Sequence, residues 1–307
     1  MLIESLQSQS GLSRSQLLYL ADTASERYKI YTIAKRGGGR RRIAHPSRAL
    51  KAVQRWISKV LILKFPVHGC ATAYKKGASI RNNANLHVNS LFTLRMDFRN
   101  FFPSFREEGI CRYLQTMNVS MNLALSEEDI SFVCSVVTRN EALTIGAPTS
   151  PAITNAIMFE FDSAVNAFAQ ARNLVFTRYA DDVFISSRRP DGLNGVFEEV
   201  VRQARLLEFV RLSINRKKTA YLSRRNRRSI TGLIVTPDGK VSIGRNRKRE
   251  IKSLIHRRLS GEAEMEDLER IRGLLAFAWN VEPDFFRSLQ VKYGRDNLRY
   301  ILGQPIS

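Results

Sequence analysis

Three aspartates could form a metal site, because each stands at the end of a segment that reads as a β-strand. Asp97 closes FTLRMD (residues 92–97), where side chains alternate and Asp97 falls on the face opposite the apolar residues. Asp181 and Asp182 lie in VFTRYADDVFIS (residues 175–186), which predicts a hairpin with the acids at its tip. A cap or a turn would explain one such aspartate without any function. Two adjacent acids are harder to explain, because like charges raise each other's pKa unless a cation lies between them.

The chemistry of such a site would be phosphoryl transfer. Carboxylates with no His or Cys nearby offer hard oxygen ligands, which suit Mg²⁺ rather than zinc. Two Mg²⁺ ions about 3.5–4 Å apart would hold the attacking and leaving oxygens of an in-line displacement. One ion would activate a primer hydroxyl and the other would hold a triphosphate, while the protein supplies positioning and charge neutralisation.

The charge of the chain favours a polyanionic partner. Its 307 residues include 49 Lys and Arg against 28 Asp and Glu, a formal net charge of +21. Residues 202–258 alone hold 18 Lys and Arg but 3 Asp and Glu. A solvated basic surface is the commoner meaning of such a region. The density favours nucleic acid instead, because clustered cations repel each other unless phosphates neutralise them, as in the runs Arg224, Arg225, Arg227, Arg228 and Arg245, Arg247, Lys248, Arg249.

The elements around these residues begin with helix and a basic hairpin. Leucines at helical spacing predict helix within residues 1–30. Two strand-like runs, residues 28–35 and 40–44, flank the triplet Gly37-Gly38-Gly39 and predict a hairpin. Its glycines are consistent with an ordinary flexible turn or with an arm that brings the arginines after them to phosphate.

Two further helices are predicted near the candidate site. One begins after Pro46, where Ser47 is a suitable N-cap and the apolar residues that follow form one stripe. The other begins near Ser150, after the loop that contains Gly146, a residue that permits close backbone approach.

The remaining composition excludes other classes of protein. Cys70, Cys111 and Cys134 are far apart and show no paired spacing, which predicts neither a disulfide framework nor a zinc site. No run approaches the roughly 18 apolar residues that a membrane span needs. The start has no secretory pattern, so we expect a cytoplasmic protein without a membrane partner. The length allows two domains or one large domain with lobes.

Four motifs in order carry a resemblance to a known family. They are DFRNFF (97–102), GAPTSP (146–151), YADD (179–182) and NRKKT (215–219), and together they resemble the palm of a reverse transcriptase. Within that family, NNANLH resembles the N-A-x-x-H signature of retron reverse transcriptases, and Ile230-Thr231-Gly232 resembles their V-T-G triplet. The resemblance runs from about residue 28 to residue 292.

The resemblance implies an α+β fold of the right-hand polymerase type, with fingers, a palm built on an antiparallel sheet and a helical thumb. The boundaries that follow from it are an N-terminal helical segment at 1–27, fingers at 28–90, palm at 91–125, a connection between fingers and palm at 126–145, palm again at 146–240, and a helical, RNA-binding thumb at 241–307.

The family's site residues can be placed on matching positions. Asp97, Asp181 and Asp182 would be the catalytic carboxylates that hold two Mg²⁺ ions. Residues expected to bind the incoming nucleotide are Arg41 with its neighbours Arg40 and Arg42, the gate candidates Phe102 and Phe101, Gly146, and Lys218, which would assist the leaving pyrophosphate. Residues expected to bind RNA are Asn83, His87, Arg245, Arg247, Lys248 and Arg249. For His87, an architectural role stays open.

The resemblance implies an RNA-directed DNA polymerase that uses dNTPs and a cognate structured non-coding RNA. Such enzymes start DNA from the 2′-hydroxyl of a guanosine and give RNA-linked single-stranded DNA (msDNA), and we expect an effector protein and a role in defence against phage. One departure is Ile145, where the family usually has Gln. The alternatives are a reverse transcriptase of a group II intron, a diversity-generating element or a CRISPR-associated system, or a non-catalytic RNA-binding scaffold.

Overall fold

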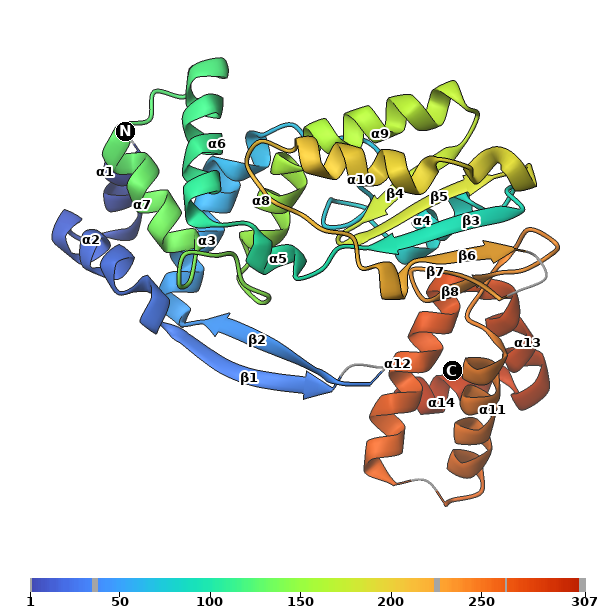
Figure 1. Cartoon of the computed structure of the whole chain (residues 1–307). Coiled ribbons are helices and arrows are strands. Elements are labelled where there is room, and N and C mark those ends of the chain that lie inside the picture. The colour runs from blue at the N-terminus through green and yellow to red at the C-terminus, as the bar shows by residue number, and fades with distance from the viewer. Residues whose placement is uncertain (1, 35–37, 224–226, 263, 304–307) are drawn as a thin grey trace.

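The chain folds into helices around antiparallel sheets, as the α+β expectation requires. The computed structural model describes residues 2–34, 38–223, 227–262 and 264–303 (Figure 1). Helices gather at the N-terminal end, a four-stranded sheet lies in the middle, and a small sheet with four helices forms what we call the C-terminal lobe, residues 228–303.

The N-terminal helices form one packed unit around α7 (Glu127–Val137). Ser13 and Ser126 each form a capping box, which fixes where the helix after it begins. Asp129 also accepts a hydrogen bond from the backbone N–H of Ile3 (2.9 Å), so the first helix is tied to α7. The helices that contact α7 are α1 (Leu2–Ser10), α2 (Arg14–Asp22), α3 (Arg48–Val60) and α6 (Glu107–Ser120).

The predicted basic hairpin is confirmed and extends away from these helices (Figure 1). Its strands are β1 (Tyr28–Ala34) and β2 (Arg40–Pro46), paired in register from Tyr28 opposite Pro46 to Ala34 opposite Arg40. The first glycine of the expected turn, Gly37, lies outside the described residues. The predicted helix after Pro46 is α3, and the Ser47 side chain accepts from the N–H of Leu50 as an N-cap should.

The central sheet has the order β4-β5-β3-β6. Its strands are β3 (Phe92–Asp97), β4 (Val175–Tyr179), β5 (Asp182–Ser187) and β6 (Ala220–Ser223), all joined antiparallel, as the alternation of the sequence predicted for the first three. The helices on this part of the chain are α8 (Ser150–Ile157), α9 (Phe159–Ala171) and α10 (Val196–Leu206), with the short α5 (Phe101–Ser104) after β3. α9 and α10 lie over one face of the sheet (Figure 1).

The sheet separates two hydrophobic cores. Val183 and Ile185 of β5 belong to the larger core, which includes the N-terminal helices, whereas Phe184 between them belongs to the core of the C-terminal lobe. The elements of that lobe are β7 (Arg228–Ile230), β8 (Leu233–Val235), β9 (Val241–Ser242), α11 (Arg245–Leu259), α12 (Met265–Val281), α13 (Pro283–Tyr293) and α14 (Arg295–Leu302).

Helix α4 (Ile80–Leu86) connects the C-terminal lobe to the central sheet. The Thr231 hydroxyl donates to the carbonyl of Ile80 (3.1 Å), and Arg81 donates to the carbonyl of Asn280 in α12 (3.1 Å). The I-T-G segment therefore contacts the start of α4, the helix that carries Asn83 and Ala84 of the N-A-x-x-H motif.

One expectation about cysteine is corrected. Cys111 of α6 and Cys134 of α7 form a disulfide, with a Cα–Cα distance of 5.9 Å, whereas Cys70 is free and buried. The pairing follows from the packing of α6 against α7, which the spacing of the cysteines does not reveal. In the described part of the chain, the helices are too short or too polar to span a membrane.

Candidate active site

The two adjacent aspartates lie at the turn between β4 and β5. The turn has two residues, Ala180 and Asp181, because Tyr179 pairs directly with Asp182. Asp97 is the register partner of Asp182 on the neighbouring strand β3. The backbone N–H of Phe98 also donates to the carbonyl of Asp181 (3.1 Å). The fold thus places the two distant segments that carry the three aspartates side by side.

Lys218 lies directly against Asp97. Its Nζ is 3.0 Å from each carboxylate oxygen of Asp97. The segment that carries Lys218 is attached to the end of β3, because the N–H of Asn215 donates to the backbone carbonyl of Asp97 (2.7 Å). The lysine expected at the leaving pyrophosphate is therefore paired here with a candidate metal ligand.

The electrostatics of the acidic turn (residues 180–182) favour a cation. Burial, together with the charges of Asp181 and Asp97, raises the pKa of Asp182 to about 7. Burial also raises the pKa of Asp181, to which the charge of Asp97 adds. These carboxylates repel one another, and a divalent cation between them would relieve the repulsion.

The donor chemistry fits a divalent cation, although the ligands are not gathered into a closed cluster. Among the residues that the structure describes, His, Cys, Asp and Glu form no group of three or more arranged to hold a metal ion. Asp97 is instead neutralised by the ammonium group of Lys218. Carboxylate oxygens are the ligands that hard cations such as Mg²⁺ or Mn²⁺ prefer.

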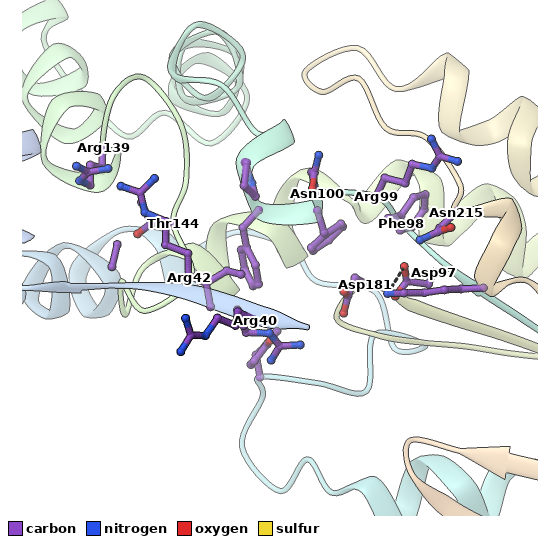
Figure 2. Close-up of a pocket in the computed structure, with 18 residues that line it drawn as sticks. Arg40, Arg42, Asp97, Phe98, Arg99, Asn100, Arg139, Thr144, Asp181 and Asn215 are labelled. Atoms are coloured by element: carbon purple, nitrogen blue, oxygen red, sulfur yellow. Dashed lines mark hydrogen bonds and ion pairs between the residues drawn. The ribbon is translucent and has the colours of Figure 1, made fainter. Parts of the chain in front are cut away.

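A cavity of about 610 Å³ opens beside the carboxylates (Figure 2). Asp97 and Asp181 line one end, and the arginines of β2 line the other. Its size and its excess of cations suit a nucleoside triphosphate. The full lining is Arg40, Arg41, Arg42, Ala44, Tyr74, Asp97, Phe98, Arg99, Asn100, Phe101, Phe102, Pro103, Arg139, Thr144, Ile145, Asp181, Asn215 and Lys218.

The cavity contains residues that sequence reasoning missed. Tyr74 comes from the connection before α4, and Arg139 and Thr144 come from the connection between α7 and α8, outside the recognised motifs. Tyr74 is 48% exposed and its ring lies 6.5 Å from that of Phe102. Their positions depend on packing between distant segments, so no local pattern marks them.

The two gate candidates differ in burial. Phe101 is 4% exposed and packs against the rings of Phe98, Phe102 and Phe105. Phe102 is half-buried and lies between Phe101 and Tyr74. Of the two rings, that of Phe102 is the more accessible from the cavity.

Gly146 holds the basic hairpin against the loop before α8. A Cβ on Gly146 would lie 2.5 Å from the carbonyl oxygen of Ala44 in β2, and the φ of Gly146 is +122°. The N–H of Ala44 donates to the carbonyl of Ile145 (2.9 Å). The close approach expected at this glycine is thus to the protein's own hairpin, and Ile145 contributes its backbone where a Gln side chain was expected.

Two of the residues expected to bind RNA are buried. The side chains of Asn83 and His87 are both 0% exposed, so direct contact with RNA is corrected to an architectural place in the fold. The ring nitrogens of His87 are each 2.8 Å from a hydroxyl, Ser186 at Nδ1 and Thr177 at Nε2. A lone polar residue in a short sequence motif does not reveal whether packing will cover it.

The burial of His87 predicts that the protein loses stability in acid. Burial, and then the charge of Arg228, lowers the pKa of His87 to about 3, against about 6.5 for an unfolded histidine. Below pH 6.5 the unfolded chain therefore binds a proton at His87 that the folded chain does not bind. The free energy of unfolding falls as the pH drops below 6.5. We expect the stability difference between wild type and His87→Gln to shrink by about 2 kcal/mol between pH 7.5 and pH 5, measured by urea unfolding. A constant difference would contradict the buried, neutral ring.

The cations of α11 divide into exposed and engaged side chains. Arg245 and Arg249 are exposed. Arg247 donates to the carbonyl of Gly232 (3.2 Å), and Lys248 pairs with Glu282 (2.5 Å). Arg228, expected among the phosphate-binding arginines, is 1% exposed, so that expectation is corrected. Arg224 and Arg225 of the same run lie outside the described residues.

This chain is similar to known polymerases. The model of a family described as reverse transcriptase (RNA-dependent DNA polymerase) matches residues 33–257. The retron Ec83 reverse transcriptase of Escherichia coli is 35% identical over 280 residues, which cover 89% of each chain. The retron Ec86 reverse transcriptase of Escherichia coli is 31% identical over 300 residues, 94% of this chain and 89% of that one. A solved foamy viral protease–reverse transcriptase in complex with double-stranded DNA has 15% identity and a TM-score of 0.49, covering 90% of this chain and 43% of that one.

Proposed function

This chain belongs to the retron reverse transcriptases and is an RNA-directed DNA polymerase, and from this premise we propose that it makes RNA-linked single-stranded DNA. It copies a cognate structured non-coding RNA, starting from the 2′-hydroxyl of a guanosine. The observation that carries the proposal is the similarity to retron enzymes over nearly the whole chain, and the carboxylates of Asp97 and Asp181 in a cation-lined cavity support it.

The proposed mechanism assigns the carboxylates to metal binding. The family implies a divalent metal, and we propose that it is Mg²⁺, two ions held by Asp97, Asp181 and Asp182. When bound, such ions would acidify the primer hydroxyl and neutralise the triphosphate. The side chain of Lys218 is 59% exposed, so it is free to turn from Asp97 toward the leaving pyrophosphate.

The basic hairpin supplies further charge for the nucleotide. Arg40, Arg41 and Arg42 follow one another along β2, and all three line the cavity that Asp97 and Asp181 also line. Guanidinium groups bind phosphate oxygens through paired N–H donors, so these arginines would orient the triphosphate for in-line attack. Arg139 lines the same cavity and is a further candidate for that contact.

The proposed division of labour follows the lobes. The hairpin and N-terminal helices act as fingers, the central sheet as palm, and the C-terminal lobe as an RNA-binding thumb. In support, the first turns of α11 carry Arg245, Arg247, Lys248 and Arg249, where the helix dipole is also positive. Like charges gathered there favour phosphate as a partner. An effector protein and a role in phage defence complete the proposal.

The test is the nucleic acid that copurifies with the protein. We would express the gene with its native flanking DNA, purify the protein, and treat the bound material with ribonuclease, deoxyribonuclease and debranching enzyme. DNA joined to RNA through a 2′–5′ branch supports the proposal. RNA alone from an enzyme that is active on primed templates would indicate another class of reverse transcriptase, and RNA alone from an inactive protein would indicate a scaffold.

Phe102 is proposed to exclude ribonucleotides. Replacing it by alanine removes the ring that would meet a ribose 2′-hydroxyl, so we expect ribonucleotide incorporation relative to deoxyribonucleotide incorporation to rise about tenfold or more. Single-nucleotide extension on a primed RNA template measures the ratio. Phe101→Ala should instead lower stability, by about 3–5 kcal/mol, because that ring is buried. A higher ratio in Phe101→Ala with none in Phe102→Ala would reverse the assignment.

Arg245 and Arg249 are proposed to contact RNA phosphates. Replacing both by glutamine should weaken RNA binding and reduce the slope of log affinity against log salt by about 0.7–0.9 for each phosphate that the protein no longer neutralises. A filter-binding salt titration measures this slope. Arg202→Gln is the matched control, because Arg202 lies in the same basic region but pairs with Glu199 (2.7 Å). An unchanged slope in the double variant would contradict the contact.

A further inference from the structure

The backbone of the acidic turn needs support from outside. Ala180 has a φ of +58°, which lies in the left-handed region. That region is unfavourable for residues with a Cβ atom. Two-residue hairpin turns need such a φ, but Gly, Asn or Asp usually supplies it. A strained turn persists only where its surroundings hold it in place. The neighbours of Ala180 therefore decide where Asp181 and Asp182 point.

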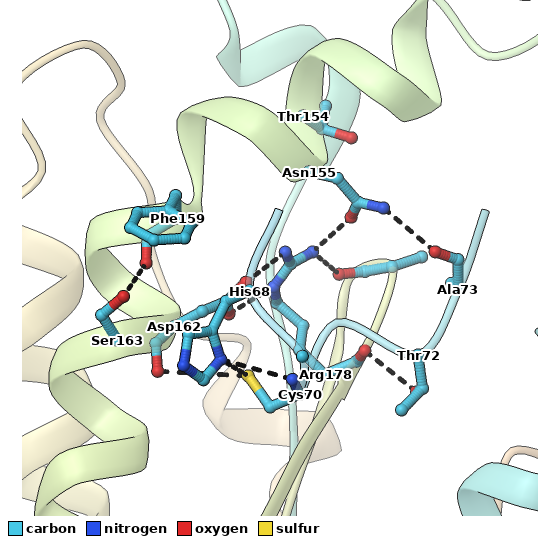
Figure 3. A network of polar contacts seen from close by, with 12 residues as sticks. His68, Cys70, Thr72, Ala73, Thr154, Asn155, Phe159, Asp162, Ser163 and Arg178 are labelled. Carbon is cyan, nitrogen blue, oxygen red and sulfur yellow. Dashed lines mark hydrogen bonds and ion pairs between the residues drawn. The ribbon is translucent and has the colours of Figure 1, made fainter. Parts of the chain in front are cut away.

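Arg178 is a side chain that holds this turn. It is completely buried, and its Nη1 donates to the carbonyl of Ala180 (3.1 Å) and to the side-chain oxygen of Asn155 in α8 (3.1 Å) (Figure 3). The carbonyl of Ala180 precedes Asp181 directly in the chain. Any shift of the Arg178 guanidinium would therefore act on the peptide that carries the candidate metal ligands.

Arg178 is in turn fixed by Asp162 of α9. Nε donates to Oδ1 (2.7 Å) and Nη2 to Oδ2 (2.6 Å), and both side chains are 0% exposed. The planar fork of arginine matches a carboxylate in this paired manner and leaves its remaining N–H groups free to point elsewhere. Burial disfavours the charge on Arg178, but Asp162 outweighs it and the pKa of Arg178 is raised.

The network reaches further into the cavity wall. Asn155 donates to the carbonyl of Ala73 (3.0 Å), and the N–H of Thr72 donates to the carbonyl of Arg178 (2.8 Å). These residues lead directly to Tyr74, which lines the cavity. Helices α8 and α9 thus meet strand β4 at the Arg178 guanidinium, and residues 72 and 73 join them through the Arg178 backbone and Asn155 (Figure 3).

A purely structural role would not require an ion pair here. Apolar residues of similar size often replace a buried pair with no loss of stability, so stability alone is weak grounds for keeping one. An apolar side chain could not donate to the carbonyl of Ala180. We propose that Arg178 is a positioning residue, which fixes the acidic turn through that carbonyl while Asp162 and Asn155 fix Arg178. The inference rests on the proposed roles of Asp181 and Asp182.

The test compares two buried arginines. Arg178→Lys keeps the charge but loses the fork, and Arg178→Met with Asp162→Leu removes both charges and leaves neither unpaired. Arg228→Lys is the matched control, because Arg228 is also buried but donates to the carbonyl of Ser90, on the other side of the sheet from α9. For each protein we would measure the thermal midpoint, RNA affinity, kcat and KM on a primed RNA template, and the divalent-ion concentration that gives half-maximal activity.

We expect both Arg178 variants to lower kcat at least about tenfold and to need more divalent ion, with RNA affinity unchanged. Arg228→Lys should keep kcat even where its thermal midpoint falls. Wild-type kcat in folded Arg178 variants, or a loss that Arg228→Lys shares, would overturn the inference. If both variants fail to fold, Asn155→Ala leaves the ion pair intact and should still lower kcat, and a wild-type kcat there would overturn it as well. An inactive wild type would instead contradict the proposed function.

Discussion

Replacing Asp181 and Asp182 together by asparagine will reduce DNA synthesis on a primed RNA template at least about a thousandfold, equivalent to about 4 kcal/mol of transition-state stabilisation. Asparagine keeps the shape of each side chain but removes the charge that would hold a divalent cation. The loss should appear in kcat at saturating nucleotide and RNA, because the change lies at the reacting groups and not in the RNA-binding surface.

The matched control for this experiment is Asp191→Asn. Asp191 lies beyond the end of β5, and its side chain is 65% exposed and near Arg189. We expect that variant to keep full activity. RNA binding should be intact in the double variant and in the control. Undiminished synthesis by the double variant would exclude these carboxylates as metal ligands, and the polymerase reaction would need other groups.

Gly146→Ala is expected to lower kcat/KM for the incoming nucleotide by tenfold to a hundredfold. The added Cβ would meet the carbonyl oxygen of Ala44 at 2.5 Å, and that oxygen belongs to the backbone and cannot turn away. Either the hairpin or the loop must move, at a cost of about 1–3 kcal/mol. The arginines of β2 would then leave their places in the cavity, so the nucleotide should bind more weakly.

Gly195→Ala separates the steric effect from backbone strain. Gly195 also has a positive φ (+74°), but nothing lies within 4 Å of the Cβ that alanine would add. Steady-state kinetics of the two variants, with thermal unfolding in parallel, should show weaker nucleotide binding in Gly146→Ala alone. Equal kinetics in the two would mean that the contact between hairpin and loop does not serve the nucleotide.

Periodicity and cap residues predicted some of the local elements, among them the basic hairpin and α3. The strand that ends at Asp97 and the two strands that flank Asp181 follow from alternation of side chains, and α3 begins where Ser47 offers an N-cap. These features depend on residues within a few positions of each other. The motifs that resemble a reverse transcriptase then assign all three aspartates to one candidate metal site.

The features that the sequence could not predict depend on packing between segments that are far apart in the chain. Arg228 and His87 look like polar surface residues in the sequence, but the C-terminal lobe and the central sheet cover them. The pairing of Cys111 with Cys134 likewise needs two helices to lie side by side. For Arg178 a signal was present, since a charge within an apolar strand must find a partner, but the sequence does not show that Asp162 is that partner.

The alternation along β5 has a consequence for how the molecule unfolds. Val183 and Ile185 face one core and Phe184 faces the other, so a single strand forms the wall of both. If either side melted, it would uncover apolar side chains of the same strand to water and weaken the remaining side. The two cores should therefore unfold in one cooperative transition, and the strand that carries Asp182 is part of the structure that makes it cooperative.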